Sequence, residues 1–161
     1  MPVREQKSPD QALPTTRVVT LLNQCIEGAI DGEKMYAIAS ADVRDPSLKE
    51  LFLRWAKDRA DFVVTMQRAV QRYGAFPLNE GTARGAAHRG WSVIVRTALG
   101  PNDKLIVEQC ERGERLSFRT YADAIRNPAF QLAPPELRSV IERQYDTCHA
   151  ALGELRRRVT T

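Results

Sequence analysis

The sequence has no long hydrophobic run. None of its apolar stretches approaches the roughly 20 residues needed to cross a bilayer, and the N-terminal stretch MPVREQKSPDQALP lacks the apolar block of a signal peptide. We therefore expect a cytoplasmic protein that does not associate with membranes.

Cysteine and histidine are scarce. The three cysteines, Cys25, Cys110 and Cys148, do not have the spacing of a zinc site, and each lies in an apolar helical pattern, so we expect reduced thiols in the core. There are only two histidines, and the chain contains no Ser/His/Asp or Cys/His constellation, phosphate-binding loop or nucleotide fingerprint. Nothing in these residues points to an enzyme.

Positive charge is in small excess only. The net charge is +4, and most of the 24 basic residues are interleaved with acids. The one dense cluster, residues 156–158, lies at the end of a predicted helix, where the helix dipole favours cations. A nucleic-acid-binding bundle is an alternative that rests on this cluster alone, and we do not expect nucleic acid as a partner.

Helical periodicity is what the sequence has in abundance. Apolar residues recur at alternating steps of four and three in four long segments, which predicts four amphipathic helices. A shorter amphipathic segment, at about 84–99, lies between the second and third of them. This pattern predicts an all-α, four-helix bundle with a long, helix-containing crossover between helices two and three. The expected ranges are a disordered tail at 1–14, a single domain at 15–161, and long helices at about 15–44, 46–73, 102–126 and 135–159.

Glu114 is out of place among the charged residues. Glu111 has a cationic partner one turn away in Arg115, whereas Glu114 lies on the inward stripe with none. Each of the other three inward stripes also carries one polar residue. Because an unpaired buried charge costs several kcal/mol, we predict an inner polar layer in which the only cation, an arginine, neutralises Glu114. Its members are Glu33, Arg59, Glu114 and Gln144.

This layer has two further expected properties. Two carboxylates around one guanidinium would leave a net negative site that a proton or a cation could complete. Gly113, beside Glu114, indicates that a neighbouring element approaches closely at the same level.

Five stretches resemble a known family. They are DGEKMY (31–36), LFLRWAKDRADF (51–62), HRGW (88–91), CERGE (110–114) and ERQY (142–145). Together they are similar to a bacterial family of uncharacterised ferritin-like bundle proteins, over nearly the whole chain after residue 15. The resemblance implies a ferritin-like fold and leaves the activity open, since that family has no assigned function.

The di-iron members of the ferritin-like superfamily use one glutamate on each of helices one and three, with Glu-x-x-His on helices two and four. Glu33 and Glu114 match the first pair of positions. The second pair is missing, because helix two has Arg59 on its inward stripe and no histidine. On helix four, Asp146 and His149 lie off the inward stripe.

We therefore expect a bundle without a di-iron site or cofactor, which acts through protein association in a stress or storage context. A homo-oligomer is expected, with a dimer favoured. The alternative is a metal-binding or redox protein that holds iron, manganese or zinc through inward glutamates. Its candidate ligands are Glu33, Glu114, Glu111, Glu142 and His149.

The HRGW element belongs to the crossover. We expect Gly90 and Trp91 to pack tightly against the bundle, and His88 to orient the crossover through a hydrogen bond rather than to act as a base.

Overall fold

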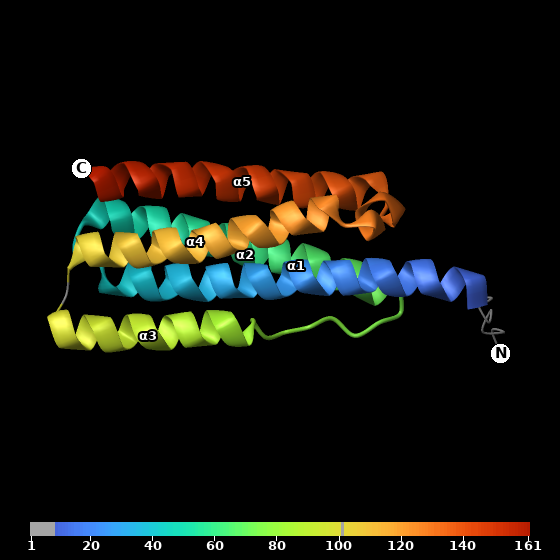
Figure 1. Cartoon of the computed structure of the whole chain (residues 1–161), viewed down its shortest axis with the longest axis horizontal. Coiled ribbons are helices and arrows are strands. Elements are labelled where there is room, and N and C mark those ends of the chain that lie inside the picture. Colours follow the sequence, from blue (N-terminus) through green and yellow to red (C-terminus); the bar gives the residue numbers. More distant parts are fainter. Residues whose placement is uncertain (1–8, 101) are drawn as a thin grey trace.

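The structure is a computed structural model that describes residues 9–100 and 102–161. Within these ranges, four long helices form a bundle, and a fifth, α3, lies outside it (Figure 1). The elements in chain order are α1 Pro9–Asp42, α2 Pro46–Arg72, α3 Ala83–Leu99, α4 Asp103–Arg126, the 3₁₀ helix η1 Pro128–Leu132, and α5 Pro135–Thr160.

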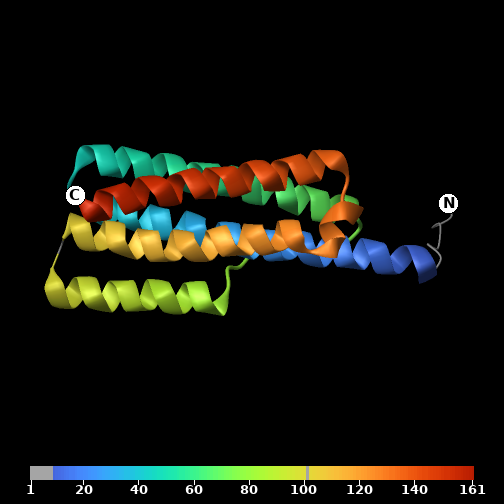
Figure 2. The ribbon, with the colours of Figure 1, turned by 45° about the horizontal axis from the view of Figure 1, so that its top comes forward.

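The long helices are arranged as a ring in which α1 contacts α2 and α4, while α5 contacts α4 and α2 (Figure 2). The prediction of an all-α, four-helix bundle with a helix in its crossover is confirmed. Within the described ranges, no helix has both the length and the hydrophobicity that a membrane span requires.

The start of α1 differs from the prediction. The helix begins at Pro9, six residues before Thr15, and includes Pro14. Pro9 is tolerated because it lies in the first turn, and Pro14 removes only one backbone hydrogen bond close to the helix start. Neither proline therefore prevents the helix from starting before Thr15. Residues 1–8 of the predicted tail lie outside the described residues.

Two aspartates define the turn between α1 and α2. Asp45 caps α2, and its carboxylate accepts a hydrogen bond from the Ser47 backbone N–H at 2.7 Å. Asp103, in the first turn of α4, accepts the backbone N–H groups of Arg44 and Asp45 at 2.9 Å each. The α1–α2 turn is therefore attached to the beginning of α4.

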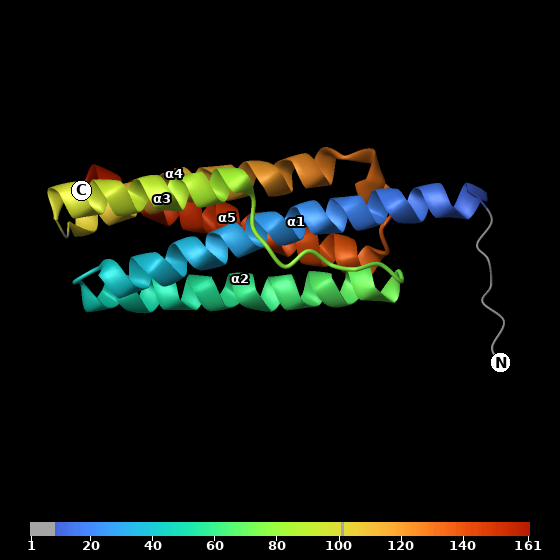
Figure 3. The ribbon, with the colours of Figure 1, turned by 90° about the horizontal axis from the view of Figure 1, so that it is seen from below.

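The crossover runs back along the outside of the bundle. Gly74 leaves α2 with a φ of 77°, and the following loop crosses α1 before α3 begins (Figure 3). α3 then lies along α1 and α4, and Gly100, with a φ of 75°, ends it. The crossover thus covers one face of the bundle with a separate outer helix.

The buried core consists of two apolar clusters that follow one another along the bundle. On α2, Ala56 belongs to one cluster and Phe62 to the other; on α4, Cys110 and Tyr121 are divided in the same way. Arg59 lies between the first two residues, and Glu114 between the second two. The two polar residues therefore lie at the level where the apolar clusters meet.

Candidate functional site

Arg59 and Glu114 form an ion pair in the centre of the bundle. Both side chains are fully buried, and Arg59 Nη2 donates to Glu114 Oε1 at 2.8 Å. The other terminal nitrogen, Nη1, donates to Asp58 Oδ2 at 2.7 Å, and the Asp58 side chain is 45% exposed. Arg59 thus joins a buried carboxylate to a partly solvated one.

The second oxygen of Glu114 also has a donor. The Tyr36 hydroxyl donates to Oε2, and the guanidinium of Arg59 lies 5.8 Å from the centre of the Tyr36 ring. Burial, and then the negative charge of Glu114, raises the pKa of the Tyr36 hydroxyl. Tyr36 therefore remains protonated and can act as a donor.

Cys148 of α5 completes the surroundings of Glu114. Burial raises the pKa of the Cys148 thiol, and the charge of Glu114 and a hydrogen bond between the two side chains raise it further. A protonated thiol is a weak donor and a poor nucleophile. Around Glu114 the protein thus places one cation and two neutral donors.

Glu33 lies outside this network. It is half-buried, and the α1 residue that faces Arg59 is Gly32, where an added Cβ would lie 3.4 Å from Arg59 Cδ and Nε. The carboxylate that accompanies Glu114 comes from Asp58 rather than from Glu33, and the α1 side chain that reaches Glu114 is Tyr36.

Gln144 is buried, but it forms no hydrogen bond with the ion pair. Its Nε2 atom, like Arg59 Nε, is buried without a hydrogen-bond partner among the described residues. The side chain of α5 that contacts Glu114 is Cys148, one turn further along. The polar layer therefore has Tyr36 and Cys148 where the sequence suggested Glu33 and Gln144.

The candidate metal ligands do not converge. Glu142 and His149 are exposed on α5, and the His149 ring lies against the rings of Phe118 and Tyr145. Among the described residues, no group of three or more His, Cys, Asp or Glu side chains is placed to hold a metal ion.

Glu111 is more than the solvated partner of Arg115 that the sequence suggested. Its side chain is 10% exposed, and it accepts hydrogen bonds from Arg115 at 2.6 Å and from Arg156 of α5 at 3.3 Å. Burial acts to raise the pKa of Glu111, but the bonds and charges of the two arginines outweigh it, and the pKa is lowered.

The other two arginines of the C-terminal cluster also have acidic partners. Arg157 and Arg158 both donate to Glu154, at 2.6 Å each. With Arg156 bonded to Glu111, all three side chains of the cluster are engaged within the bundle.

Asp31 attaches α3 to the bundle, a role that was not predicted from the sequence. It accepts the Thr82 backbone N–H at 3.2 Å, the Thr82 hydroxyl at 2.5 Å and the Arg89 guanidinium at 3.0 Å. Gly81 and Gly85 lie so close that an added Cβ at either position would collide with Asp31. The pair of glycines around Thr82 was the available signal, since it leaves room for a side chain from another element.

The HRGW element contacts the bundle through its first two residues, His88 and Arg89, of which Arg89 pairs with Asp31 of α1. His88 Nε2 donates to the Gln109 carbonyl at 3.2 Å, so the expected orienting bond is present. In contrast, Trp91 is 57% exposed, and no atom of a described residue lies within 4 Å of a Cβ added at Gly90. The expected tight packing at these two positions is wrong, because both lie on the outer face of α3.

Gly113 does mark a close approach. A Cβ added there would collide with Met35 Sδ and lie 3.5 Å from His88 Nε2. The glycine therefore allows α1 and α3 to meet α4 at the level of the buried ion pair.

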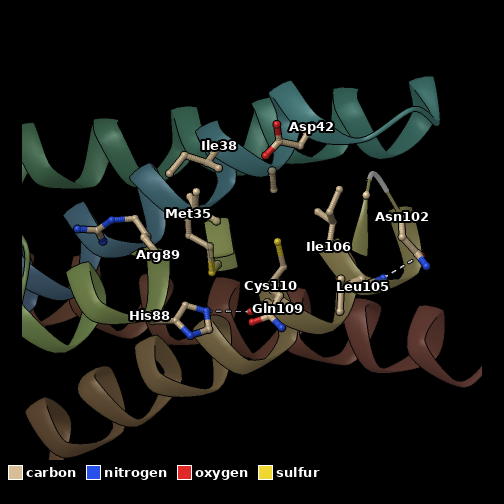
Figure 4. Close-up of a pocket in the computed structure, with 13 residues that line it drawn as sticks. Met35, Ile38, Asp42, His88, Arg89, Asn102, Leu105, Ile106, Gln109 and Cys110 are labelled. Carbon is tan, nitrogen blue, oxygen red and sulfur yellow. Dashed lines mark hydrogen bonds between the residues drawn. The ribbon is translucent and has the colours of Figure 1, made fainter. Parts of the chain in front are cut away.

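Two adjoining pockets lie between α3, α1 and α4, and we call them together the α3 groove. They share Met35, His88 and Arg89 as lining residues. The wider pocket, near the start of α3, has a volume of about 330 Å³. The narrower, of about 50 Å³, lies toward Gly100 and is lined largely by apolar side chains (Figure 4).

The comparisons with known proteins identify a family and a fold. Residues 17–127 match the family described as a domain of unknown function, DUF2383. No curated protein matches the chain. A solved structure described as ferritin like, diiron-carboxylate proteins from Bacillus anthracis str. Ames has a TM-score of 0.70 and 17% identity, and the match covers 91% of this chain and 97% of that one.

At this identity the structural likeness shows the fold alone, and it confirms the resemblance to ferritin-like bundles. Since the family match spans more than half of the sequence, the chain belongs to the DUF2383 family.

Proposed function

We propose that this ferritin-like bundle works without a di-metal centre and through pairing with a second copy of itself. The observation that carries the proposal is the exposed apolar face of α3. Trp91 and Ile94 are 57% and 60% exposed, which is unusual for such large side chains next to one another on one helix.

The spacing on this face supports a second copy as the partner. Ala87, Trp91, Ile94 and Ala98 are all exposed and follow one another at steps of four, three and four, which is the spacing of a helix-pairing seam. The order small, large, large, small reads the same in both directions. An antiparallel copy of α3 would thus place each alanine against an alanine and Trp91 against Ile94 about a two-fold axis.

The donor set of the interior supports a function without a di-metal centre. The structural neighbour is described as a diiron-carboxylate protein, and such centres need several carboxylates and histidines directed at one point. Here both oxygens of Glu114 are engaged by Tyr36 and Arg59, and the cation at this level is a guanidinium. These residues do not fit a dinuclear metal site.

The association is tested by sedimentation velocity on the wild type, Ile94→Asp and the matched control Val64→Asp. Val64 is 43% exposed on α2, away from α3. We expect dimers for the wild type and for Val64→Asp, and monomers for Ile94→Asp, because a charge would be buried in the pairing face. A monomeric wild type, or a dimeric Ile94→Asp variant, would refute the pairing.

The metal-free state is tested by elemental analysis of protein purified without chelators. We expect iron, manganese and zinc well below one ion per chain. Stoichiometric metal that is lost in a Glu114→Gln variant would overturn this part of the proposal.

A further inference from the structure

We propose that the α3 groove binds a compact amphipathic anion, namely a carboxylate or phosphate ester with a short alkyl chain. The two ends of the groove differ in their chemistry. This site lies on the inner side of α3, opposite the face proposed for pairing, so neither proposal depends on the other.

The wide end carries a net positive charge, with three arginines and two aspartates in its lining. Its acids are Asp31 and Asp123, and its arginines are Arg84, Arg89 and Arg119. Asp31 pairs with Arg89, while Asp123 pairs at 3.5 Å on the exposed surface with Arg126, which lies outside the groove. Within the described part of the chain, Arg84 and Arg119 have no acidic partner, and an anion between them would supply one.

These two arginines come from different elements. Arg84 is in the first turn of α3, and Arg119 is on α4, so they face the wide end from two sides. A guanidinium presents a planar set of N–H donors that suits carboxylate and phosphate oxygens. Two such groups around an open space of about 330 Å³ can hold an anionic head group.

The narrow end offers hydrocarbon and sulfur instead. Met35 and Cys110 contribute sulfur atoms, and Ile38, Leu105 and Ile106 contribute alkyl groups (Figure 4). Asp42 and Asn102 also line this pocket. A volume of about 50 Å³ has room for roughly four groups the size of a water molecule or a methylene. The ligand that matches both ends therefore has an anionic head and a short chain.

The protein fixes the boundary between the two ends. Arg89 and His88 of α3 line both pockets. Asp31 holds Arg89 in place, and the hydrogen bond to the Gln109 carbonyl holds His88. The two pockets thus adjoin at a constant position, and a bound chain would pass beside Met35.

Isothermal titration with five probes tests the proposal. Octanoate and octyl phosphate carry head and chain, octanol carries the chain alone, and acetate and inorganic phosphate carry the charge alone. We expect at least one of the two amphiphiles to bind, and at least tenfold tighter than any of the three partial probes. Which amphiphile binds more tightly identifies the head group.

Matched variants locate the site. The double variant Arg84→Gln/Arg119→Gln should weaken binding about tenfold or more, since two charge-assisted contacts are lost, while Arg112→Gln, an exposed arginine of α4 outside the groove, should not. Ile38→Gln should weaken binding of the ligand's alkyl chain and so of the amphiphile, and the control Val64→Gln should not. Melting curves followed by circular dichroism establish that each variant is folded.

Three results would overturn the proposal: no heat from either amphiphile at millimolar concentration, equal binding of octanol or of a small anion, or equal weakening by Arg112→Gln. The last would show that general charge attraction, and not the groove, accounts for the binding.

Discussion

The buried ion pair allows a quantitative prediction. Replacing Arg59 by Met leaves a side chain of similar length at a fully buried position. Among the described residues, it removes the only cation that contacts Glu114. Glu114 is then a buried carboxylate whose donors, within the part of the chain that the structure describes, are Tyr36 and Cys148. We expect the variant to lose about 3–5 kcal/mol of unfolding free energy, the usual cost of breaking a buried pair on one side.

The magnitude is large enough for two independent measurements. Small domains have a total stability of about 5–15 kcal/mol, so the urea midpoint of Arg59→Met should fall markedly. For a chain of this size each kcal/mol corresponds to roughly 2–4 °C, so the melting temperature should fall by about 6–20 °C. Arg54→Met is the matched control, because the Arg54 side chain on the same helix is 66% exposed. It should cost less than about 0.5 kcal/mol.

A double variant separates the charge from the packing. In Arg59→Met/Glu114→Gln the buried charge is absent, and the amide oxygen can still accept the bond from Tyr36. We expect this protein to be more stable than Arg59→Met by about 2 kcal/mol or more. If Arg59→Met costs under about 1 kcal/mol, or if the double variant is no more stable than the single one, the ion pair does not hold the core as argued.

Two further predictions concern the contacts between elements. Asp31→Asn should speed amide hydrogen exchange throughout α3, because the charge that holds Thr82 and Arg89 is lost. The control Glu33→Gln, two residues away, should leave the exchange in α3 unchanged. Equal exchange in both variants would contradict the role of Asp31. The pKa of Glu111 is lowered in the folded protein, so its contribution to stability is present above the ordinary value of 4.5 and is lost as the pH falls. Between about pH 5 and pH 3 the unfolding free energy should therefore fall more steeply in the wild type than in Glu111→Gln, and parallel curves would refute this.

The helices could be predicted from the sequence because their signals are local. Apolar periodicity and the Asp45–Pro46 cap placed α2 to within a residue or two. Glu114 could be recognised as a buried charge for the same reason, since its own helix offers no cation. Arg59 was the matching cation on another inward stripe, and the structure brings the two together.

The rotation of each helix could not be read to the same precision. Neighbouring residues differ by about 100° around the axis, so Gly32, Glu33 and Tyr36 are all compatible with a stripe that faces α2. Tyr36 also reads as an apolar core residue, and its hydroxyl gives no sign of a polar partner. This is why Glu33 was expected where Tyr36 reaches Glu114.

Contacts of the crossover are long-range, and periodicity carries no information on them. Asp31 and its partners Thr82 and Arg89 are 51 and 58 residues apart in the chain. Trp91 was expected inside because large aromatic side chains usually pack in the core. The structure instead makes α3 an outer layer, which leaves one side of that helix exposed.

The absence of a side chain at position 32 links two distant positions in the evolution of the family. A methyl group there would just touch Arg59, and anything larger would displace the guanidinium from Glu114. Homologues that keep an arginine at the position of residue 59 should therefore carry glycine or alanine at position 32. Homologues with a bulkier residue at position 32 should have replaced both the arginine at 59 and the glutamate at 114. Aligned family sequences would thus record whether the ion pair has been inherited as one unit.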